Sequence, residues 1–336
     1  MMKSIRVLHW VLLPWGLLPW VLGLLCATPG WAVPAIALHE VRQAPLVAVA
    51  RAGQGWVAVG DHGVVALSDD GRAWQQARRV PVDGLLTAVS FIDDRQGWAV
   101  GHGGVLLHSV DGGRDWELQQ RLEGRPVLLS VLFSDSRHGL VVGAYGYAAR
   151  TVDGGNHWQV VRVGEEGDDF HLNQVFRAAD GSLFVVGEAG RAYRSSDQGA
   201  SWQRLETGVS GSLWTGTGLR DGRVLLAGMS GRVLLGDSQG REWRVLDSGS
   251  HEAITAVTQL DDGRVALVGN AGLVAVSDPR VAQFTSHQRE DRLNLSALTA
   301  QSGRLLLFGS AGVLDSVAPD AKAPGAARQS SEKAPR

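Results

Sequence analysis

The stretch Trp98–Trp116, WAVGHGGVLLHSVDGGRDW, decides the fold because it joins two glycine-rich turns to a short apolar run. Its first half contains a Gly-x-x-Gly pattern at Gly101–Gly104, directly after an apolar segment. Its second half, Ser109–Trp116, has the form Ser-x-Asp-x-Gly-x-x-Trp. Glycine adopts positive φ and tolerates close backbone approach, so such positions favour tight turns. The stretch therefore predicts short β-strands joined by hairpin turns.

The Gly-x-x-Gly pattern recurs seven times with a nearly constant period. The copies begin at Gly60, Gly101, Gly143, Gly187, Gly228, Gly269 and Gly309, at separations of 41, 42, 44, 41, 41 and 40 residues. Each period also holds strand-like runs; the second reads LLTAVSFID, GWAVG, VLLHS and WELQQRL. Four short strands in about 41 residues is the size of one propeller blade. We predict an all-β, seven-bladed β-propeller of four-stranded antiparallel blades over residues 33–317.

The last period lacks an outer strand, and the segment Ala35–Ala44 precedes the first period without a blade of its own. We expect this N-terminal segment to form the fourth strand of the last blade. Such closure removes the unpaired strand edges of an open array.

The two ends of the chain have compositions of their own. Residues 1–32 combine basic Lys3 and Arg6 with a long apolar run and small residues before a plausible cleavage point, which predicts a secretory signal peptide or an uncleaved anchor. We therefore expect a periplasmic protein. Residues 318–336 contain no large apolar side chain and predict a disordered tail. The only cysteine, Cys26, lies in the signal segment, so cleavage leaves no thiol for a disulfide, a zinc site or a nucleophile.

The aspartate string is repeated in the earlier blades. Its carboxylates can accept hydrogen bonds from their own turns, and its tryptophans can pack on a neighbouring sheet. A catalytic site needs an asymmetric set of groups in one place, whereas these residues are equivalent positions around a ring. We therefore assign them structural roles. The residues concerned are Asp69, Asp111, Asp153, Asp197, Trp74, Trp116, Trp158, Trp202 and Trp243.

The string resembles the Asp-box, or bacterial neuraminidase repeat. The longer pattern GWAVG..G.hhh.S.DGG..W is similar to that of the photosystem II assembly/stability factor-like propellers, over nearly all of residues 46–317. This resemblance implies a non-enzymatic factor that binds a membrane protein precursor. In bacteria without photosynthesis, some similar chains are thought to accompany export machinery.

Other classes of function find less support in the sequence. The net charge is −2, which favours neither nucleic-acid binding nor a polybasic membrane surface. A sialidase requires a tyrosine nucleophile and three converging arginines, but the chain has three tyrosines and no Phe/Tyr-Arg-Ile-Pro string. No spacing typical of a metal site, a phosphate loop or a hydrolase occurs. We expect no catalytic, metal or cofactor site and no small-molecule substrate.

We expect binding on the face that carries the Gly-x-x-Gly turns and the connections between blades, because loops on a rigid scaffold carry binding residues. The longest and most acidic connection is RVGEEGDDFH. The leading hypothesis is an exported scaffold or assembly factor that binds a membrane protein or its assembly intermediate. A carbohydrate-active Asp-box propeller is the alternative, and a purely structural envelope protein is a third reading. The candidate binding residues are His62, His102, Tyr145, Glu188, Arg79, Arg125, Arg191 and Arg232.

Overall fold

The computed structural model describes residues 34–301 and 303–317. The chain divides into two units, Met1–Ala32 and Val33–Arg336, and the described residues belong to the second. The expected signal segment and the expected C-terminal tail lie outside the described residues.

The described strands form seven antiparallel sheets, six with four strands and one with three. We call these sheets blades 1 to 7. Blade 1 consists of β1 (Leu46–Ala52), β2 (Gly55–Gly60), β3 (Val65–Ser68) and β4 (Gln75–Gln76). Blade 2 consists of β5 (Leu86–Phe91), β6 (Gly97–Gly101), β7 (Val105–Ser109) and β8 (Glu117–Arg121). Blade 3 consists of β9 (Leu128–Phe133), β10 (Gly139–Gly143), β11 (Ala148–Thr151) and β12 (Gln159–Val160). Blades 4 and 5 consist of β13 (Leu172–Arg177), β14 (Leu183–Gly187), β15 (Ala192–Ser195) and β16 (Gln203–Leu205); and β17 (Leu213–Gly218), β18 (Val224–Gly228), β19 (Arg232–Gly236) and β20 (Trp243–Asp247). Blades 6 and 7 consist of β21 (Ile254–Gln259), β22 (Val265–Gly269), β23 (Leu273–Ser277) and β24 (Phe284–Gln288); and β25 (Leu295–Gln301), β26 (Arg304–Gly309) and β27 (Gly312–Val317).

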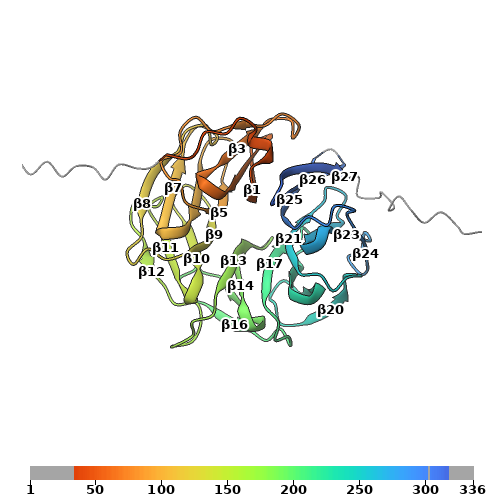
Figure 1. Cartoon of the computed structure of the whole chain (residues 1–336). Helices are drawn as coiled ribbons and strands as arrows, with labels where there is room; N and C mark the ends of the chain where they lie inside the picture. Colours follow the sequence, from red (N-terminus) through yellow and green to blue (C-terminus); the bar gives the residue numbers. More distant parts are fainter. Residues whose placement is uncertain (1–33, 302, 318–336) are drawn as a thin grey trace, which may run out of the picture. The chain divides into compact units, whose positions relative to one another are not determined.

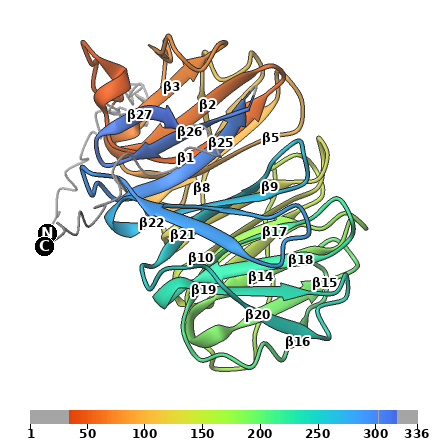
Figure 2. The ribbon, with the colours of Figure 1, turned by 90° about the vertical axis from the view of Figure 1, so that its right-hand side faces the viewer.

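The blades are arranged in a ring around a central axis (Figure 1). The first strand of each blade contacts the first strand of the next, and β25 of blade 7 contacts β1 of blade 1. Figure 2 shows the twisted sheets from the side. The prediction of a seven-bladed β-propeller is confirmed.

The Gly-x-x-Gly patterns of blades 1 to 6 are tight turns between the second and third strands. Each turn is a single 3-10 turn: η2 (Asp61–Gly63), η3 (His102–Gly104), η4 (Ala144–Gly146), η5 (Glu188–Gly190), η6 (Met229–Gly231) and η7 (Asn270–Gly272). A β-carbon on Gly101 would lie 2.1 Å from the Leu85 carbonyl oxygen, and Gly104 has φ +67°. The first glycine is thus required by close backbone approach and the last by its left-handed conformation.

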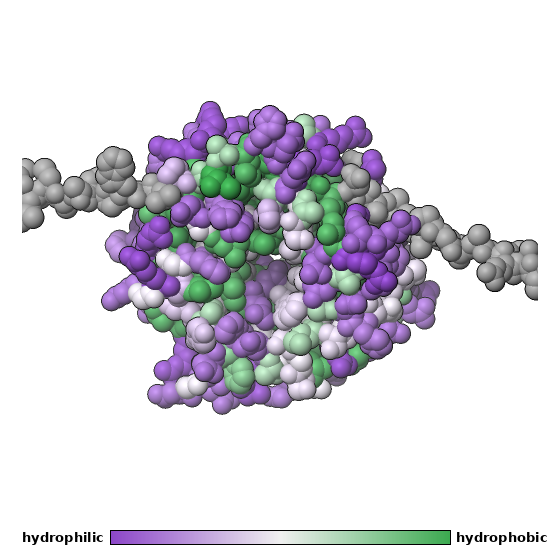
Figure 3. All heavy atoms as spheres, viewed as in Figure 1, coloured by the Kyte–Doolittle hydropathy of each residue, from purple (hydrophilic) through white to green (hydrophobic). Residues whose placement is uncertain are grey.

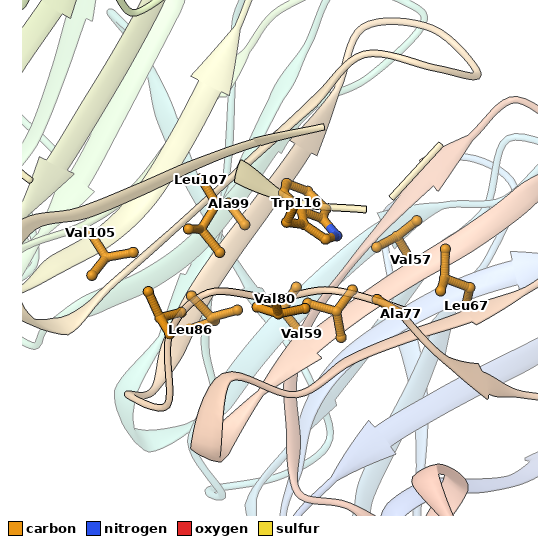
Figure 4. Packing of buried hydrophobic residues seen from close by; sticks show 12 residues of the cluster. Val57, Val59, Leu67, Ala77, Val80, Leu86, Ala99, Val105, Leu107 and Trp116 are labelled. Carbon is orange, nitrogen blue, oxygen red and sulfur yellow. The ribbon is translucent and has the colours of Figure 1, made fainter. Parts of the chain in front are cut away.

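The hydrophobic core consists of seven clusters, one at each junction between adjacent blades. The cluster between blades 1 and 2 contains Trp116, which is fully buried and packs edge-on against Phe91 at 6.0 Å. Figure 4 shows Trp116 beside Val57 and Leu67 of blade 1. Each sheet therefore buries both of its faces against its neighbours, and no blade has an independent core.

The expectation that Ala35–Ala44 forms the outer strand of blade 7 is wrong. Blade 7 has three strands among the described residues, and the N-terminal segment contains the 3-10 turn η1 (Val41–Gln43) and no strand. The side chain of Gln76 in β4 accepts a hydrogen bond from the Leu38 N–H (2.9 Å) and donates one to the Ile36 carbonyl (2.6 Å). These bonds hold the segment against blade 1, and it forms no strand beside β27.

The N-terminal segment still contributes to closure by packing. A β-carbon on Gly312 would lie 2.0 Å from the Arg42 carbonyl oxygen, just as one on Gly63 would lie 2.0 Å from Val82 O. Arg42 thus occupies the place of a connection between blades. Val41 and Ala44 are buried in the cluster that joins blade 7 to blade 1, so hydrophobic contact closes the ring where a strand was expected.

Candidate functional site

The antiparallel order of each blade gives the propeller two distinct faces. Turns between the second and third strands lie at the same end as the connections between blades. We call this side the connection face; it carries η2 to η7. Turns between the first and second strands, and between the third and fourth, lie at the opposite end. We call that side the aspartate face, because the repeated aspartate string lies there.

In blade 2 the aspartate string forms a closed set of hydrogen bonds within its own turn. The Ser109 hydroxyl donates to Asp111 Oδ1 (2.9 Å) and accepts from the Gly113 N–H (2.9 Å). Asp111 Oδ1 also accepts from the N–H groups of Arg114 and Asp115, both at 3.0 Å. The buried Trp116 indole donates to the Gly113 carbonyl at 2.8 Å. The carboxylate therefore holds the turn, and the turn positions the tryptophan.

The same pattern appears in blades 3 and 4. Hydrogen bonds from the backbone and side chain of His157 and from the Thr151 hydroxyl lower the pKa of Asp153 to about 2. The Ser201 hydroxyl and N–H, with the Ser195 hydroxyl, lower the pKa of Asp197 to about 2. Both carboxylates are therefore charged at neutral pH.

In blade 1 the structure assigns the carboxylate role to Asp70, so the prediction of Asp69 is wrong. Asp70 Oδ1 accepts from the Ser68 hydroxyl (3.2 Å) and from the N–H groups of Arg72 (2.8 Å) and Ala73 (2.9 Å). No hydrogen bond to Asp69 is found within the described residues. Blade 1 lacks one residue between the carboxylate and the glycine, and this deletion makes Asp69 look like the match.

Sequence reasoning missed further aspartates with the same local role. Asp237 in blade 5 and Asp278 in blade 6 each accept backbone hydrogen bonds in the turn before the fourth strand. Turns between the first and second strands carry aspartates two residues before the N–H group that they bind. The aspartates of these turns are Asp93, Asp135, Asp180, Asp221 and Asp262. A short Asp-x-x signal is too common in turns to have been selected from the sequence.

The remaining box tryptophans vary in their surroundings. Trp74 packs edge-on against Phe308 of blade 7 at 5.5 Å, and Trp158 packs against Phe133 at 6.0 Å. The indole N–H groups of Trp202 and Trp243 are buried without a hydrogen-bond partner within the described part of the chain. These side chains pack between blades and do not line a common site.

On the connection face, the predicted residues His62, His102, Tyr145 and Glu188 occupy equivalent turns of blades 1 to 4. The structure connects Tyr145 and Glu188 through His171, a residue that the sequence analysis did not select. The Tyr145 and His171 rings meet edge-on at 4.9 Å, and His171 Nδ1 lies 3.3 Å from Glu188 Oε2. Tyr145 is 74% exposed, although it lies on a well-packed scaffold. His62 and His102 take no part in this cluster.

The four predicted arginines are not brought together. Arg79 was expected on the connection face, but it lies beside the outer strand of blade 2, where Nη2 contacts Glu117 Oε1 at 3.0 Å and its carbonyl accepts the Trp116 N–H. The chain after β4 continues extended along the next blade, and this places Arg79 at the rim. Arg125 lies in the β8–β9 connection, and Arg232 is exposed at the start of β19.

Arg191 is mostly buried on the connection face. Its Nη2 contacts Asp168 Oδ1 at 3.3 Å, and its guanidinium lies over the Phe170 ring at 4.2 Å. The side chains of Arg191 and Asp168 are only 13% and 20% exposed. The Nε and Nη1 groups of Arg191 are buried without a partner in the described residues. Arg191 thus fixes the long acidic connection onto blade 4.

A cavity of about 350 Å³ lies between this connection and blades 3 and 4. We call it the connection pocket. Its walls combine valine and phenylalanine side chains with polar groups that include a carboxylate and a tyrosine hydroxyl. The residues that define it are Gly146, Val161, Val163, Asp168, Phe170 and Tyr193. Burial raises the pKa of the Tyr193 phenol, which is therefore neutral and able to donate or accept a hydrogen bond.

A second hollow of about 260 Å³ follows the axis of the ring (Figure 3). All seven first strands line it, and its polar lining includes Thr87, Asn173 and Thr255. The Thr87 and Thr255 hydroxyls and the Asn173 amide donate to backbone carbonyls of neighbouring blades. These side chains bind the first strands to one another, so this channel is part of the scaffold.

Within residues 34–301 and 303–317, no group of three or more His, Cys, Asp or Glu side chains is arranged to hold a metal ion. None of the helices there has the length and apolar character needed to cross a membrane.

The fold and the two faces define a seven-bladed repeat propeller with aspartate-braced turns on one face and a loop-built pocket on the other. The chain belongs to the family described as photosynthesis system II assembly factor YCF48, whose model matches residues 31–134 and 119–312. No curated protein matches the chain in a sequence comparison.

Solved structures show the same fold at low sequence identity. YCF48 bound to a D1 peptide is 19% identical, with a TM-score of 0.67 over 84% of this chain and 97% of that one. YCF48 from Cyanidioschyzon merolae is 17% identical, with a TM-score of 0.64 over 84% and 96%. Virginiamycin B lyase from Staphylococcus aureus is 8% identical, with a TM-score of 0.71 over 82% and 94%. Propellers of different function thus share this architecture.

Proposed function

We propose that the protein is an exported, non-enzymatic scaffold that binds a membrane protein or its assembly intermediate in the periplasm. The observation that carries this proposal is the connection face, where an exposed tyrosine and a pocket with both apolar and polar lining are built on a rigid ring. Loops held by a rigid scaffold are the usual place for binding residues. A concave site that combines apolar side chains with a few oriented polar groups is typical of a recognition site.

Family membership supports a protein partner. The family is described as an assembly factor, and one relative has been solved with a D1 peptide bound. For the present chain we infer the same class of partner, a segment of a membrane protein. The apolar N-terminal run and its basic start support export.

The aspartate face supports a role without catalysis. A general acid needs a pKa raised toward the working pH. The pKa values of Asp153 and Asp197 are instead lowered to about 2 by hydrogen bonds within their own turns. A carboxylate that is fully engaged by its own backbone is suited to hold a turn.

Affinity capture tests this proposal. The purified protein is immobilised and exposed to detergent extracts of the envelope of the producing cells, and a panel of glycans is assayed in parallel for binding and turnover. We expect capture of a membrane protein and no glycan turnover. Saturable glycan binding or turnover without any captured protein would reject the scaffold and favour a carbohydrate-active propeller.

A further inference from the structure

The connection pocket contains a tyrosine hydroxyl without a partner. Tyr193 is 2% exposed, and within residues 34–301 and 303–317 its hydroxyl forms no hydrogen bond. Buried tyrosine hydroxyls normally find a partner. The hydroxyl belongs to a residue that lines the cavity, so a group that enters the cavity can satisfy it.

Gly164 lies beside two polar groups of the pocket. A β-carbon built on Gly164 would lie 2.9 Å from Asp168 Oδ2 and 3.1 Å from the Tyr193 hydroxyl oxygen. The two oxygens therefore lie at most 6.0 Å apart, close to Gly164, and all three residues line the cavity. A hydrogen-bond donor that enters the cavity between the two oxygens meets a carboxylate and a hydroxyl oxygen together, and this pairing favours a positively charged donor.

The charge of the pocket lining also favours a positively charged ligand. Among the residues that line it, Glu165 and Asp168 are acidic and Arg162 is basic, which leaves a net charge of −1. The carboxylates of Glu165 and of the following Glu166 have side chains 72% and 88% exposed.

The apolar part of the wall suits the stem of a long basic side chain. Val161, Val163 and Phe170 line the cavity together with Tyr193. Lysine and arginine bury their methylene stems on apolar surface while the charged head finds polar partners.

We propose that the connection pocket takes a lysine or arginine side chain of the partner, whose charged group binds Asp168 and the Tyr193 hydroxyl beside Gly164. This inference rests on the proposed protein-binding function and specifies its recognition chemistry. The partner segment is basic at this position and apolar beside it, because Tyr145 provides an exposed ring at the neighbouring turn.

Peptide binding tests the proposal. The probes are capped, alanine-based pentapeptides with a central lysine, arginine, glutamine or glutamate, titrated into the purified full-length protein by calorimetry. We expect the lysine or arginine peptide to bind about tenfold more tightly than the glutamine peptide. Its affinity should fall as salt is raised, because surface charges contribute to it.

Variants with matched controls identify the site. Tyr193→Phe removes only the hydroxyl, and we expect it to lower the affinity for the basic peptide about tenfold. Tyr147→Phe makes the same change in the neighbouring cluster between blades 2 and 3, outside the pocket, and should have no effect. Gly164→Ala fills the space between the two oxygens and should abolish the preference for a basic peptide. Gly84→Ala, in another connection with open space around it, should leave this preference unchanged.

Three outcomes would overturn the inference. The first is equal binding of the lysine and glutamine peptides, and the second is an equal effect of Tyr193→Phe and Tyr147→Phe. The third is a gain in peptide affinity when the four basic residues of 318–336 are changed to glutamine, since the chain's own tail would then be the occupant. If envelope capture still succeeds in these cases, the proposed function stands without this recognition mode. Failed capture rejects the function itself.

Discussion

Replacing Asp111 with alanine should destabilise the propeller without reaching the binding face. Asp111 Oδ1 accepts hydrogen bonds from the Ser109 hydroxyl and from the N–H groups of Arg114 and Asp115, at 2.9–3.0 Å. Partial burial acts to raise the pKa of Asp111, but these bonds outweigh it and hold the pKa below its ordinary value. The carboxylate is therefore bound in its charged form.

The size of this destabilisation follows from the comparable loss of a helix N-cap, which costs about 0.5–2 kcal/mol for one bonded N–H. Two N–H groups and a hydroxyl lose their acceptor here, so we expect about 2 kcal/mol. The exposed contact with Arg78 adds little, because surface ion pairs contribute about 0–1 kcal/mol. For a domain of this size the midpoint of thermal unfolding should fall by on the order of 4 °C.

The assay is urea unfolding followed by tryptophan fluorescence, with Asp69→Ala as the matched control. Asp69 is an exposed aspartate in the equivalent turn of blade 1 and forms no hydrogen bond within the described residues. Equal midpoints for the two variants would refute the reasoning. Unchanged stability of Asp111→Ala together with lost partner capture would refute the structural role of the string.

Three further predictions concern the scaffold. Gly101→Ala should lower the free energy of unfolding by about 1–3 kcal/mol, because its β-carbon would collide with a backbone carbonyl; Gly84→Ala, in open space, should leave it unchanged or slightly raised, as urea titrations would show. Trp116→Ala should cost about 3–5 kcal/mol, since the ring is fully buried between two blades, and calorimetry should show a correspondingly lower melting temperature. Stability should also fall in acid. The pKa values of Asp153 and Asp197 are about 2 in the folded protein against 3.8 ordinarily, so the two carboxylates contribute fully to the free energy of unfolding above pH 4, and this contribution is lost as the pH falls toward 2. Unfolding midpoints that stay constant from pH 5 to pH 2 would contradict this assignment.

The number of blades could be predicted from the sequence because it depends on local signals. Gly101 and Gly104 mark one turn by backbone approach and by positive φ, and the same two requirements recur in every period. The closure of the ring could not be predicted in the same way. The path of the N-terminal segment depends on Gln76, whose side chain binds Leu38 and Ile36 from positions 38 and 40 residues away.

The connection pocket shows a second limit. Phe170 and Asp168 lie in the connection after blade 3, whereas Tyr193 belongs to blade 4. Sequence reasoning selected this connection for its acidity, but the pocket arises because Arg191 of blade 4 holds the connection through Asp168 and Phe170. Long-range packing of this kind leaves no periodic signal. Asp70 was missed for the opposite reason, because a one-residue deletion shifted a strong local pattern.

Site-specific photo-crosslinking tests most directly whether the connection face binds the partner. One variant carries a benzoylphenylalanine at Tyr145, which is 74% exposed on the connection face of blade 3. The other carries it at Val152, which is 48% exposed after β11, on the aspartate face of the same blade. Irradiation in cells should yield an adduct with a membrane protein from position 145 and none from position 152. An adduct only from position 152, or none from either while the protein is folded, would contradict the assignment.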